Sequence, residues 1–329
     1  MNIRTILGMG SVAVSLALAG CGGGGGTDNP VTPPSGNAPI QGRYLMAFHT
    51  CQPSACSNPQ NHSTWLAQSD DGIAWQPVPG YTPHNGSVPD VIRRDNTLYI
   101  FNPNRVRRYD FSTQRWSDPL PVTLTTASGQ NELFVDPSLT LDEQGRLVMF
   151  YLVGQMGSDP AQCAPGQSPC TKVFRSATEV AGSDGTAFTV DAGDRLTVEL
   201  QAGEIASDPD IFKAPVAGQV LYISRGMGTA AYTSSTLRGT YSAAGKGLLT
   251  QAGGVPAGHY DSTSGRYWTY VHSNQADGLQ VIRRTTHAGL DTAIDSSSFT
   301  TVIGSGSYPS LGSGVSAASP SFTVNLARP

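Results

Sequence analysis

From residue 41 onward, hydrophobic and polar positions alternate in short runs. Runs of β-branched and aromatic residues are bounded by clusters of Gly, Asn, Asp, Ser and Pro, which is typical of strands separated by turns. The clearest of these runs predict strands over 43–49, 97–101, 146–153, 219–224 and 266–272. No stretch shows the 3.6-residue period of an amphipathic helix. The pattern therefore predicts one all-β domain over residues 41–329.

A weak internal repeat narrows the architecture. Five prolines begin it: Pro89, Pro137, Pro209, Pro256 and Pro320. Each of the first four is followed, after a polar turn, by a strongly apolar strand, whereas the fifth is followed only by the C-terminus. The first strand, 43–49, has no proline motif before it. We therefore expect a five-bladed β-propeller that is closed by the C-terminal strand joining the first blade, because ring closure removes an exposed sheet edge.

The N-terminus predicts export and a membrane anchor. Residues 1–20 have one early positive charge, Arg4, and an apolar run too short for a comfortable membrane span. The run ends in LAGC, which resembles the lipobox of bacterial lipoproteins and implies cleavage before Cys21 and lipidation of Cys21. The alternative is an ordinary signal peptide with an incidental cysteine. Residues 21–40 are rich in Gly and Pro and predict a tether.

The cell envelope is the expected location, with the lipid in the outer membrane, since Gly22 rather than Asp follows the cysteine. Four cysteines remain, Cys51, Cys56, Cys163 and Cys170, and three pairings are possible. Local pairing, Cys51 with Cys56 and Cys163 with Cys170, is the simplest prediction for an exported chain. A zinc site built from all four lacks the CxxC spacing, so we expect no metal centre there.

Charge excludes one class of partner. The chain has 20 Lys and Arg against 24 Asp and Glu, and charged residues make up only 13 %. Because the basic pairs are short and scattered, we expect no nucleic-acid partner. We expect a monomer whose membrane contact is the lipid.

Acidic residues cluster around the prolines. In a propeller the inner strands start at one mouth of the central channel, and residues two apart on a strand share a face. This places Asp90, Asp136, Asp208 and Asp210 near one axis. The structural alternative is that these side chains bond backbone amides at strand starts. A cluster of carboxylates needs compensation by a proton, a cation or a substrate, so a structural Ca²⁺ is possible, and we expect no other cofactor.

Three of these contexts, SVPDVIRRDNTLYIF, VDPSLTLDEQGRLVMFY and SDPDIFKAPVAGQVLYISRG, resemble motifs of the five-bladed propeller glycosidases. That group comprises the arabinofuranosidase and xylosidase type and the related invertase and levansucrase type. The resemblance implies that Asp90 is the base or nucleophile and Asp136 the carboxylate that orients the acid. Asp208 takes the place of the general acid, which is a Glu in that group. Asp90 follows its proline rather than preceding it.

Other residues could complete such a site. Glu204 and Glu132 could replace the missing Glu if their loops bend inward, and His49 and His259 are candidates for lining the mouth beside Asp210. The segment 69–75, SDDGIAW, resembles a shortened Asp-box of sialidase-like propellers, and 184–188 is a degenerate copy. We interpret both as structural hairpins. A sialidase is the weaker alternative, since no set of arginines stands at the inner-strand starts.

Two functions follow as hypotheses. The first is a lipid-anchored glycoside hydrolase that acts on an extracellular or periplasmic glycan through Asp90, Asp136 and Asp208. The second is a non-catalytic carbohydrate-binding or assembly lipoprotein on the same scaffold, which the missing Glu favours.

Overall fold

The computed structural model describes residues 40–155, 161–164, 166, 169–309 and 311–325. Cys21, the signal segment and nearly all of the tether therefore lie outside the described residues. Strands dominate, and the helical turns are η1 (Pro53–Ala55), η2 (Pro59–Asn61) and η3 (Ser296–Ser298). In the described part of the chain, no helix has the length and apolarity needed to cross a membrane. The prediction of an all-β chain is confirmed.

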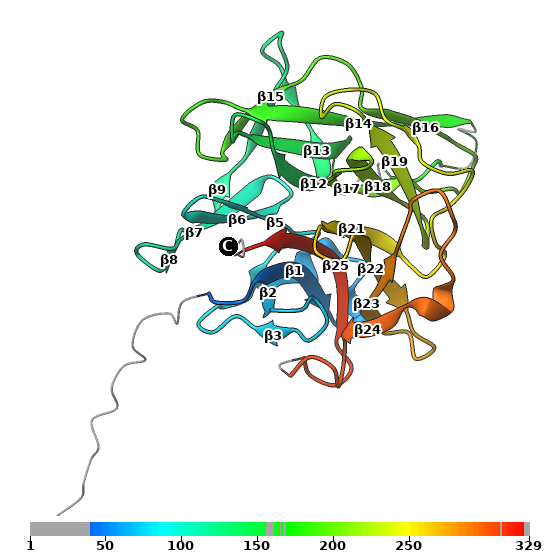
Figure 1. The fold of residues 1–329 in the computed structure, drawn as a ribbon. Coiled ribbons are helices and arrows are strands. Elements are labelled where there is room, and N and C mark those ends of the chain that lie inside the picture. The colour runs from blue at the N-terminus through cyan, green and yellow to red at the C-terminus, as the bar shows by residue number, and fades with distance from the viewer. Residues whose placement is uncertain (1–39, 156–160, 165, 167–168, 310, 326–329) are drawn as a thin grey trace, which may run out of the picture. The chain divides into compact units, whose positions relative to one another are not determined.

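The strands form five sheets (Figure 1). The first contains β25 (Ser316–Val324), β1 (Tyr44–Cys51), β2 (Ser63–Ser69), β3 (Gln76–Pro77) and β4 (His84–Asn85). The second contains β5 (Asp90–Arg94), β6 (Thr97–Asn102), β7 (Arg105–Asp110), β8 (Arg115–Trp116) and β9 (Leu120–Pro121). The third contains β12 (Phe134–Leu141), β13 (Leu147–Val153), β14 (Cys170–Glu179), β15 (Ala187–Val190), β10 (Thr123–Thr125), β11 (Asn131–Glu132) and β16 (Leu196–Leu200). The fourth contains β17 (Ser207–Ala214), β18 (Gly218–Arg225), β19 (Gly228–Ser234) and β20 (Ser242–Ala243). The fifth contains β21 (Gly254–Asp261), β22 (Arg266–Asn274), β23 (Gln280–His287) and β24 (Thr300–Ile303).

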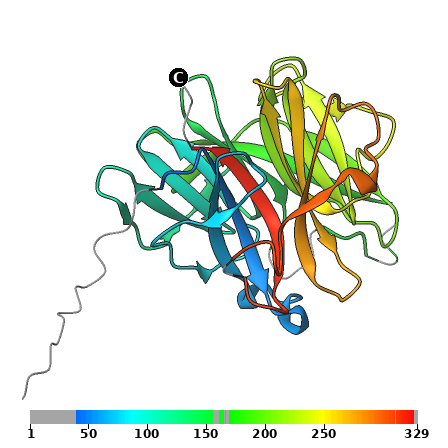
Figure 2. The ribbon, with the colours of Figure 1, turned by 60° about the horizontal axis from the view of Figure 1, so that its bottom comes forward.

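The sheets have a propeller-like arrangement. Their inner strands contact one another in the cycle β5, β12, β17, β21, β25 and back to β5. The C-terminal strand β25 pairs antiparallel with the N-terminal strand β1, with Phe322 opposite Met46, and Figure 2 shows the red and blue strands side by side. The third sheet departs from a simple four-stranded blade, because β10 adds to β15 in parallel and brings β11 with it.

The proline repeat is a structural unit. The residue before each proline has a positive φ: Val88 38°, Asp136 53°, Asp208 48°, Val255 45° and Ser319 53°. Proline disfavours helical conformations in the residue that precedes it, and a β-branched residue at positive φ is an outlier. In β12, β17, β21 and β25 the register shifts at this dipeptide, which is a β-bulge. The five contexts that the sequence aligned therefore share one strained backbone shape.

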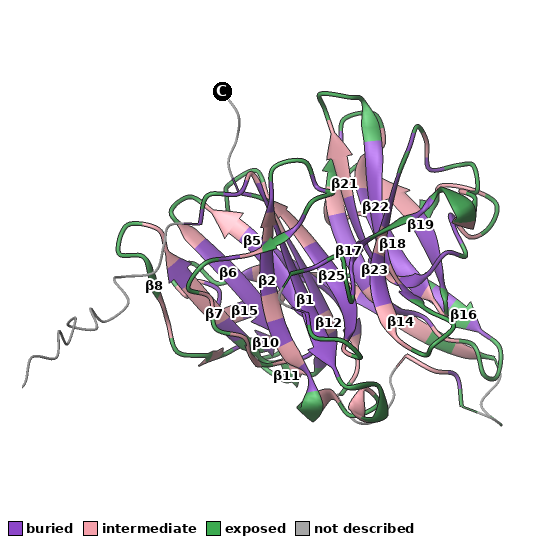
Figure 3. Ribbon diagram, turned by 90° about the horizontal axis from the view of Figure 1, so that it is seen from below, coloured by how far each residue is buried: buried purple, intermediate pink, exposed green. Residues whose placement is uncertain are grey.

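Burial decreases from the inner to the outer strands of a sheet, as in β1, β2 and β3. Figure 3 shows buried positions along the inner strands and intermediate or exposed ones toward the ends and loops. Between the second and third sheets, for example, Phe101, Tyr151 and Phe188 belong to one buried cluster. Strands such as β1 and β13 are buried on both faces and read as nearly continuous apolar runs, whereas the outer strand β16 alternates between buried and exposed positions.

Both predicted disulfides are present. Cys51 is bonded to Cys56, with Cα atoms 5.2 Å apart, and Cys163 to Cys170, with Cα atoms 5.8 Å apart. Each closes the loop between the second and third strands of its sheet, β1 to β2 and β13 to β14. Local pairing is therefore confirmed.

The two turns that resemble Asp-boxes carry structural contacts. In the first, Asp71 Oδ1 accepts hydrogen bonds from the amides of Ile73 (2.7 Å) and Ala74 (2.8 Å), above the buried Trp75. In the second, Asp184 forms ion pairs with Arg94 (3.0 Å) and Arg108.

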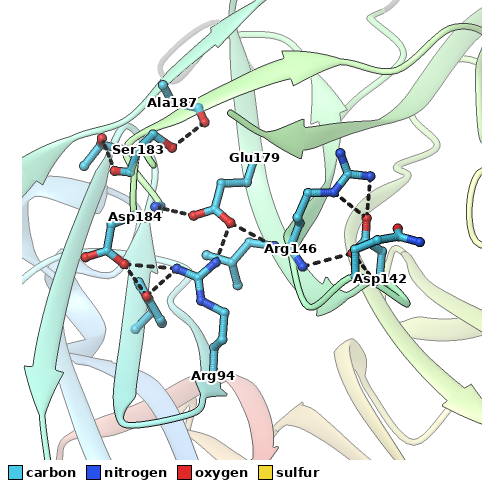
Figure 4. A network of polar contacts seen from close by, with 12 residues as sticks. Arg94, Asp142, Arg146, Glu179, Ser183, Asp184 and Ala187 are labelled. Atoms are coloured by element: carbon cyan, nitrogen blue, oxygen red, sulfur yellow. Dashed lines mark hydrogen bonds and ion pairs between the residues drawn. The ribbon is translucent and has the colours of Figure 1, made fainter. Parts of the chain in front are cut away.

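Figure 4 shows that Arg94 also contacts Glu179, whose other oxygen accepts from Gly185 N (2.7 Å). Glu179 itself is buried. This network links β5 of the second sheet to β14 and the following turn of the third.

Candidate functional site

The inner strands converge on a small polar cavity. It is lined by the five prolines and by eight of the residues beside them, including Asp90, Asp136, Asp208 and Asp210. Its volume is about 20 Å³. A buried water needs roughly 10–15 Å³ measured in this way. The cavity therefore has room for about one water, and a sugar could meet these residues only at the mouth.

The residues after the prolines form a belt of hydrogen bonds between neighbouring sheets. Their side-chain oxygens accept from the amide two residues after the next sheet's proline. The four links are Ser321 Oγ from Val91 N (2.8 Å), Asp90 Oδ2 from Leu139 N (3.0 Å), Ser138 Oγ from Ile211 N (3.1 Å) and Asp210 Oδ2 from Gly258 N (2.7 Å). The fifth position is Ala257, whose methyl group offers no acceptor to Phe322 N. We call these four links the belt.

The belt uses two of the four clustered carboxyls. Asp90 is 5 % exposed, and its Oδ1 also accepts from Ser321 Oγ (2.7 Å). Burial raises the pKa of Asp90 to about 7, against its hydrogen bonds. Burial, and then the nearby charge of Asp90, raises the pKa of Asp210 well above its ordinary value. Both side chains thus join sheets through backbone amides, as the structural alternative expected. The prediction that the proline motif marks strand starts is wrong for Asp210, which lies inside β17, because the strand continues through the bulge.

The residues before the prolines form a second ring, the mouth ring: Val88, Asp136, Asp208, Val255 and Ser319. Asp136 and Asp208 are adjacent and partly exposed, and Asp208 N donates to Asp136 Oδ2 (3.3 Å). Ser207 Oγ donates to Asp208 Oδ2 (2.5 Å).

Protonation couples Asp136 to Asp208. Burial raises the pKa of Asp208 to about 6. Burial, and then the charge of Asp208, raises the pKa of Asp136 well above its ordinary value. Both carboxyls are therefore easier to protonate than isolated ones, and a proton on one favours ionisation of the other. We call these two residues the mouth pair.

The two glutamates considered as substitutes are not among the residues that line the cavity. Glu204 is exposed, accepts from Gln201 N (2.8 Å) and lies 3.6 Å from Arg225. Glu132 forms an ion pair with Arg175 (2.6 Å) and accepts from the Tyr151 hydroxyl. Neither loop bends its carboxylate into the mouth.

The two candidate histidines occupy different places. His259 packs against the rings of Tyr44, Trp268 and Phe322, away from the cavity lining. His49 is buried, and its Nδ1 accepts from Val88 N (3.3 Å). His49 therefore contacts the backbone of the mouth ring at Val88 and does not line the cavity.

One group of potential metal ligands lies beside the ring. Ligand atoms of His49, Cys51 and His62 lie within 4.8 Å of one another. However, Cys51 Sγ is bonded to Cys56, and both ring nitrogens of His62 have partners, Ser87 Oγ (2.7 Å) and Cys56 O (2.9 Å). With its thiol oxidised, this group does not offer an open set of ligands.

The belt serines, Ser138 and Ser321, are the residues whose role the sequence reasoning missed. A signal was present, because they stand in the same place after the proline as Asp90 and Asp210. All four side chains are short acceptors, and that shared property points to a repeated structural link rather than to chemistry.

Comparison with known proteins gives a limited result. No family model matches the sequence, and no curated protein matches it. Among solved structures, a GH43_1 enzyme from Xanthomonas citri complexed with xylose is similar with a TM-score of 0.49, 15 % identity and coverage of 79 % of this chain and 93 % of that chain. A protein of unknown function from Dyadobacter fermentans is similar with a TM-score of 0.47 and 12 % identity, and the match covers 81 % of this chain and 82 % of that chain. An α-L-arabinofuranosidase from Clostridium thermocellum is similar with a TM-score of 0.41 and 14 % identity, and the match covers 74 % of this chain and 83 % of that chain.

Proposed function

We propose that residues 41–329 form a closed five-bladed propeller of the glycosidase type, held at the cell envelope by a lipid on Cys21. The closed cycle of inner strands, the pairing of β25 with β1 and the five equivalent prolines, each preceded by a residue of positive φ, support the blade count. The three sequence motifs that resemble propeller glycosidases lie in three of those equivalent positions. The anchor rests on the lipobox-like LAGC.

We propose that this protein binds a glycan at the channel mouth and does not hydrolyse it. One observation carries this proposal: the mouth ring has two carboxyls, which are adjacent and coupled, above a cavity for about one water. Glycoside hydrolysis needs an acid and a second, ionised carboxylate that flank the scissile bond. Two neighbouring carboxyls whose protonation is coupled act as a single unit, which suits bidentate hydrogen bonding to sugar hydroxyls.

A second candidate is hydrolysis through the mouth pair. It is favoured by the pKa of Asp208, raised to about 6, because a general acid works best near the operating pH. In this candidate Asp208 protonates the leaving oxygen, and Asp136 serves as the second carboxylate.

One experiment separates the two. The detergent-solubilised protein is titrated with xylohexaose and arabinohexaose by calorimetry and, separately, incubated with aryl pyranosides and furanosides. Binding without hydrolysis, weakened about tenfold by Asp136→Asn, supports the lead proposal. Hydrolysis that Asp136→Asn abolishes supports the second. If the protein shows neither binding nor hydrolysis, both candidates are refuted. Asp118→Asn, on the exposed surface, is the matched control.

The anchor and the absence of a cofactor are tested separately. Labelled palmitate should enter the protein and should be lost in Cys21→Ser, with the label in the outer-membrane fraction. A wild-type protein that takes up no label overturns the anchor.

Dialysis against EDTA should leave glycan binding unchanged, since the proposal includes no metal.

A further inference from the structure

A pair of adjoining depressions lies on the fourth and fifth sheets, away from the channel. Their volumes are about 310 Å³ and about 580 Å³, and they share Ala288, Gly289 and Asp291. Small-molecule sites usually occupy about 300–1,000 Å³, so either depression can accept a sugar ring. We call them together the double depression.

The double depression is separate from the mouth. It shares no lining residue with the channel cavity. Tyr260, in its wall, lies four residues after Pro256 on β21, and at ~3.3 Å per residue this is about 13 Å along the strand. A ligand here occupies the other end of the inner strand.

Tyrosines form one wall. The partly exposed Tyr260 ring packs edge-on against Tyr267, with ring centroids 5.1 Å apart and planes at 69°. The buried Tyr267 stacks on His287 at 5.4 Å and 17°. These contacts fix the Tyr260 ring without covering it fully. A rigid aromatic ring with a polar tip suits the apolar face and hydroxyl rim of a sugar.

Polar groups surround this wall. Asp291, Arg266 and Thr286 are exposed lining residues, and Arg266 Nη2 donates to the Thr286 carbonyl (3.3 Å). The rim thus carries charges of both signs and hydroxyl groups. This composition matches a neutral polyol, which donates to carboxylates and accepts from guanidinium groups, better than it matches an ion of either sign.

We propose that the double depression is a second carbohydrate site, which binds a neutral oligosaccharide. One sugar ring packs on Tyr260, and the chain continues past Asp291 toward Arg266. The site does not depend on the mouth pair for its contacts, so it stands or falls separately from the proposed function. Two sites at opposite ends of the inner strands allow one anchored protein to hold a glycan at two points, which raises avidity where the glycan can span both.

The test uses the full-length protein in detergent with xylohexaose, cellohexaose and mannohexaose as probes, followed by calorimetry and saturation-transfer NMR. Tyr260→Ala should weaken binding at this site about tenfold, whereas Tyr260→Phe, which keeps the ring, should stay within about threefold. Asp291→Ala should also weaken it. Thermal unfolding of each variant checks that the fold is kept.

The two sites are distinguished by stoichiometry. If both proposals hold, wild type binds two equivalents, and Tyr260→Ala and Asp136→Asn each remove a different one. If only the mouth proposal fails, one equivalent remains and is sensitive to Tyr260 alone. Binding that Tyr260→Ala leaves unchanged overturns the second site, as does the absence of any saturation transfer at 10 mM probe. Tighter binding of an alanine-rich peptide probe than of all three sugars overturns the choice of ligand.

Discussion

Removing the charge of Asp90 while keeping its hydrogen bonds should stabilise the protein at alkaline pH. Asp90 is buried in the belt, where it accepts from Leu139 N and from Ser321 Oγ. In Asp90→Asn, the amide oxygen can still accept from Leu139 N, and the amide nitrogen can donate to Ser321 Oγ. The belt stays connected, and the buried carboxyl can no longer ionise.

The direction of this pH effect on the unfolding free energy follows from proton binding. The pKa of Asp90 is raised by burial from 3.8 to about 7, so the folded protein holds a proton that the unfolded chain releases. Stability therefore falls as pH rises from about 4 to about 7. Linkage gives a cost of about 1.7 kcal/mol at pH 5 and about 4 kcal/mol at pH 8. Between these pH values, wild type should lose about 2.5 kcal/mol relative to Asp90→Asn.

The assay is urea unfolding of both proteins at pH 5 and pH 8, followed by far-UV circular dichroism and tryptophan fluorescence. The quantity compared is the change in unfolding free energy between the two pH values, because contributions from groups far from Asp90 largely cancel in that difference. Asp210 does not cancel, since the charge of Asp90 raises its pKa, and its contribution adds to the difference in the same direction. Asp118→Asn, on the exposed surface, is the control and should follow wild type. Equal pH slopes in wild type and Asp90→Asn would refute the account of Asp90 as a buried belt carboxyl.

Three further perturbations test the belt and the disulfides. Ala257→Ser adds the missing fifth acceptor opposite Phe322 N and should raise unfolding free energy by about 0.5–1.5 kcal/mol, measured by urea titration; a loss of stability would contradict the belt geometry. Gly258→Ala should cost about 1–3 kcal/mol, since a Cβ there would lie 2.0 Å from the Phe212 ring, and an unchanged melting temperature would argue against that close approach. Replacing Cys51 and Cys56 together by serine should cost about 2 kcal/mol for their short loop, seen as a lower urea midpoint than wild type, and no shift would mean that the pair does not constrain the chain.

Local patterns account for the elements that were predicted well. The strands expected over 97–101 and 219–224 are β6 and β18, because β-branched and aromatic runs bounded by turn residues report on pleated, buried backbone without reference to distant partners. The disulfides were predictable for the same reason, since each joins cysteines in one loop. The equivalence of the five proline contexts could also be predicted, because each repeat carries its own proline preceded by a residue of positive φ.

The sequence could not predict that the acidic cluster divides into two pairs with different roles. The sequence grouped Asp90, Asp136, Asp208 and Asp210 as one set, and the structure separates a belt pair from a mouth pair. The difference arises at the bulge, where a positive φ interrupts the regular alternation of side chains. Counting along the strand therefore cannot say which carboxyl faces the mouth and which reaches the neighbouring sheet.

The sequence by itself predicted an all-β chain with five proline-marked inner strands, two local disulfides and an acidic cluster. Only the tertiary structure decided what the acids do there. Asp90 finds its amide 49 residues away on β12, and Ser321 finds Val91 across 230 residues. Such partners are set by the packing of neighbouring sheets, and that packing is a property of the assembled fold rather than of any segment.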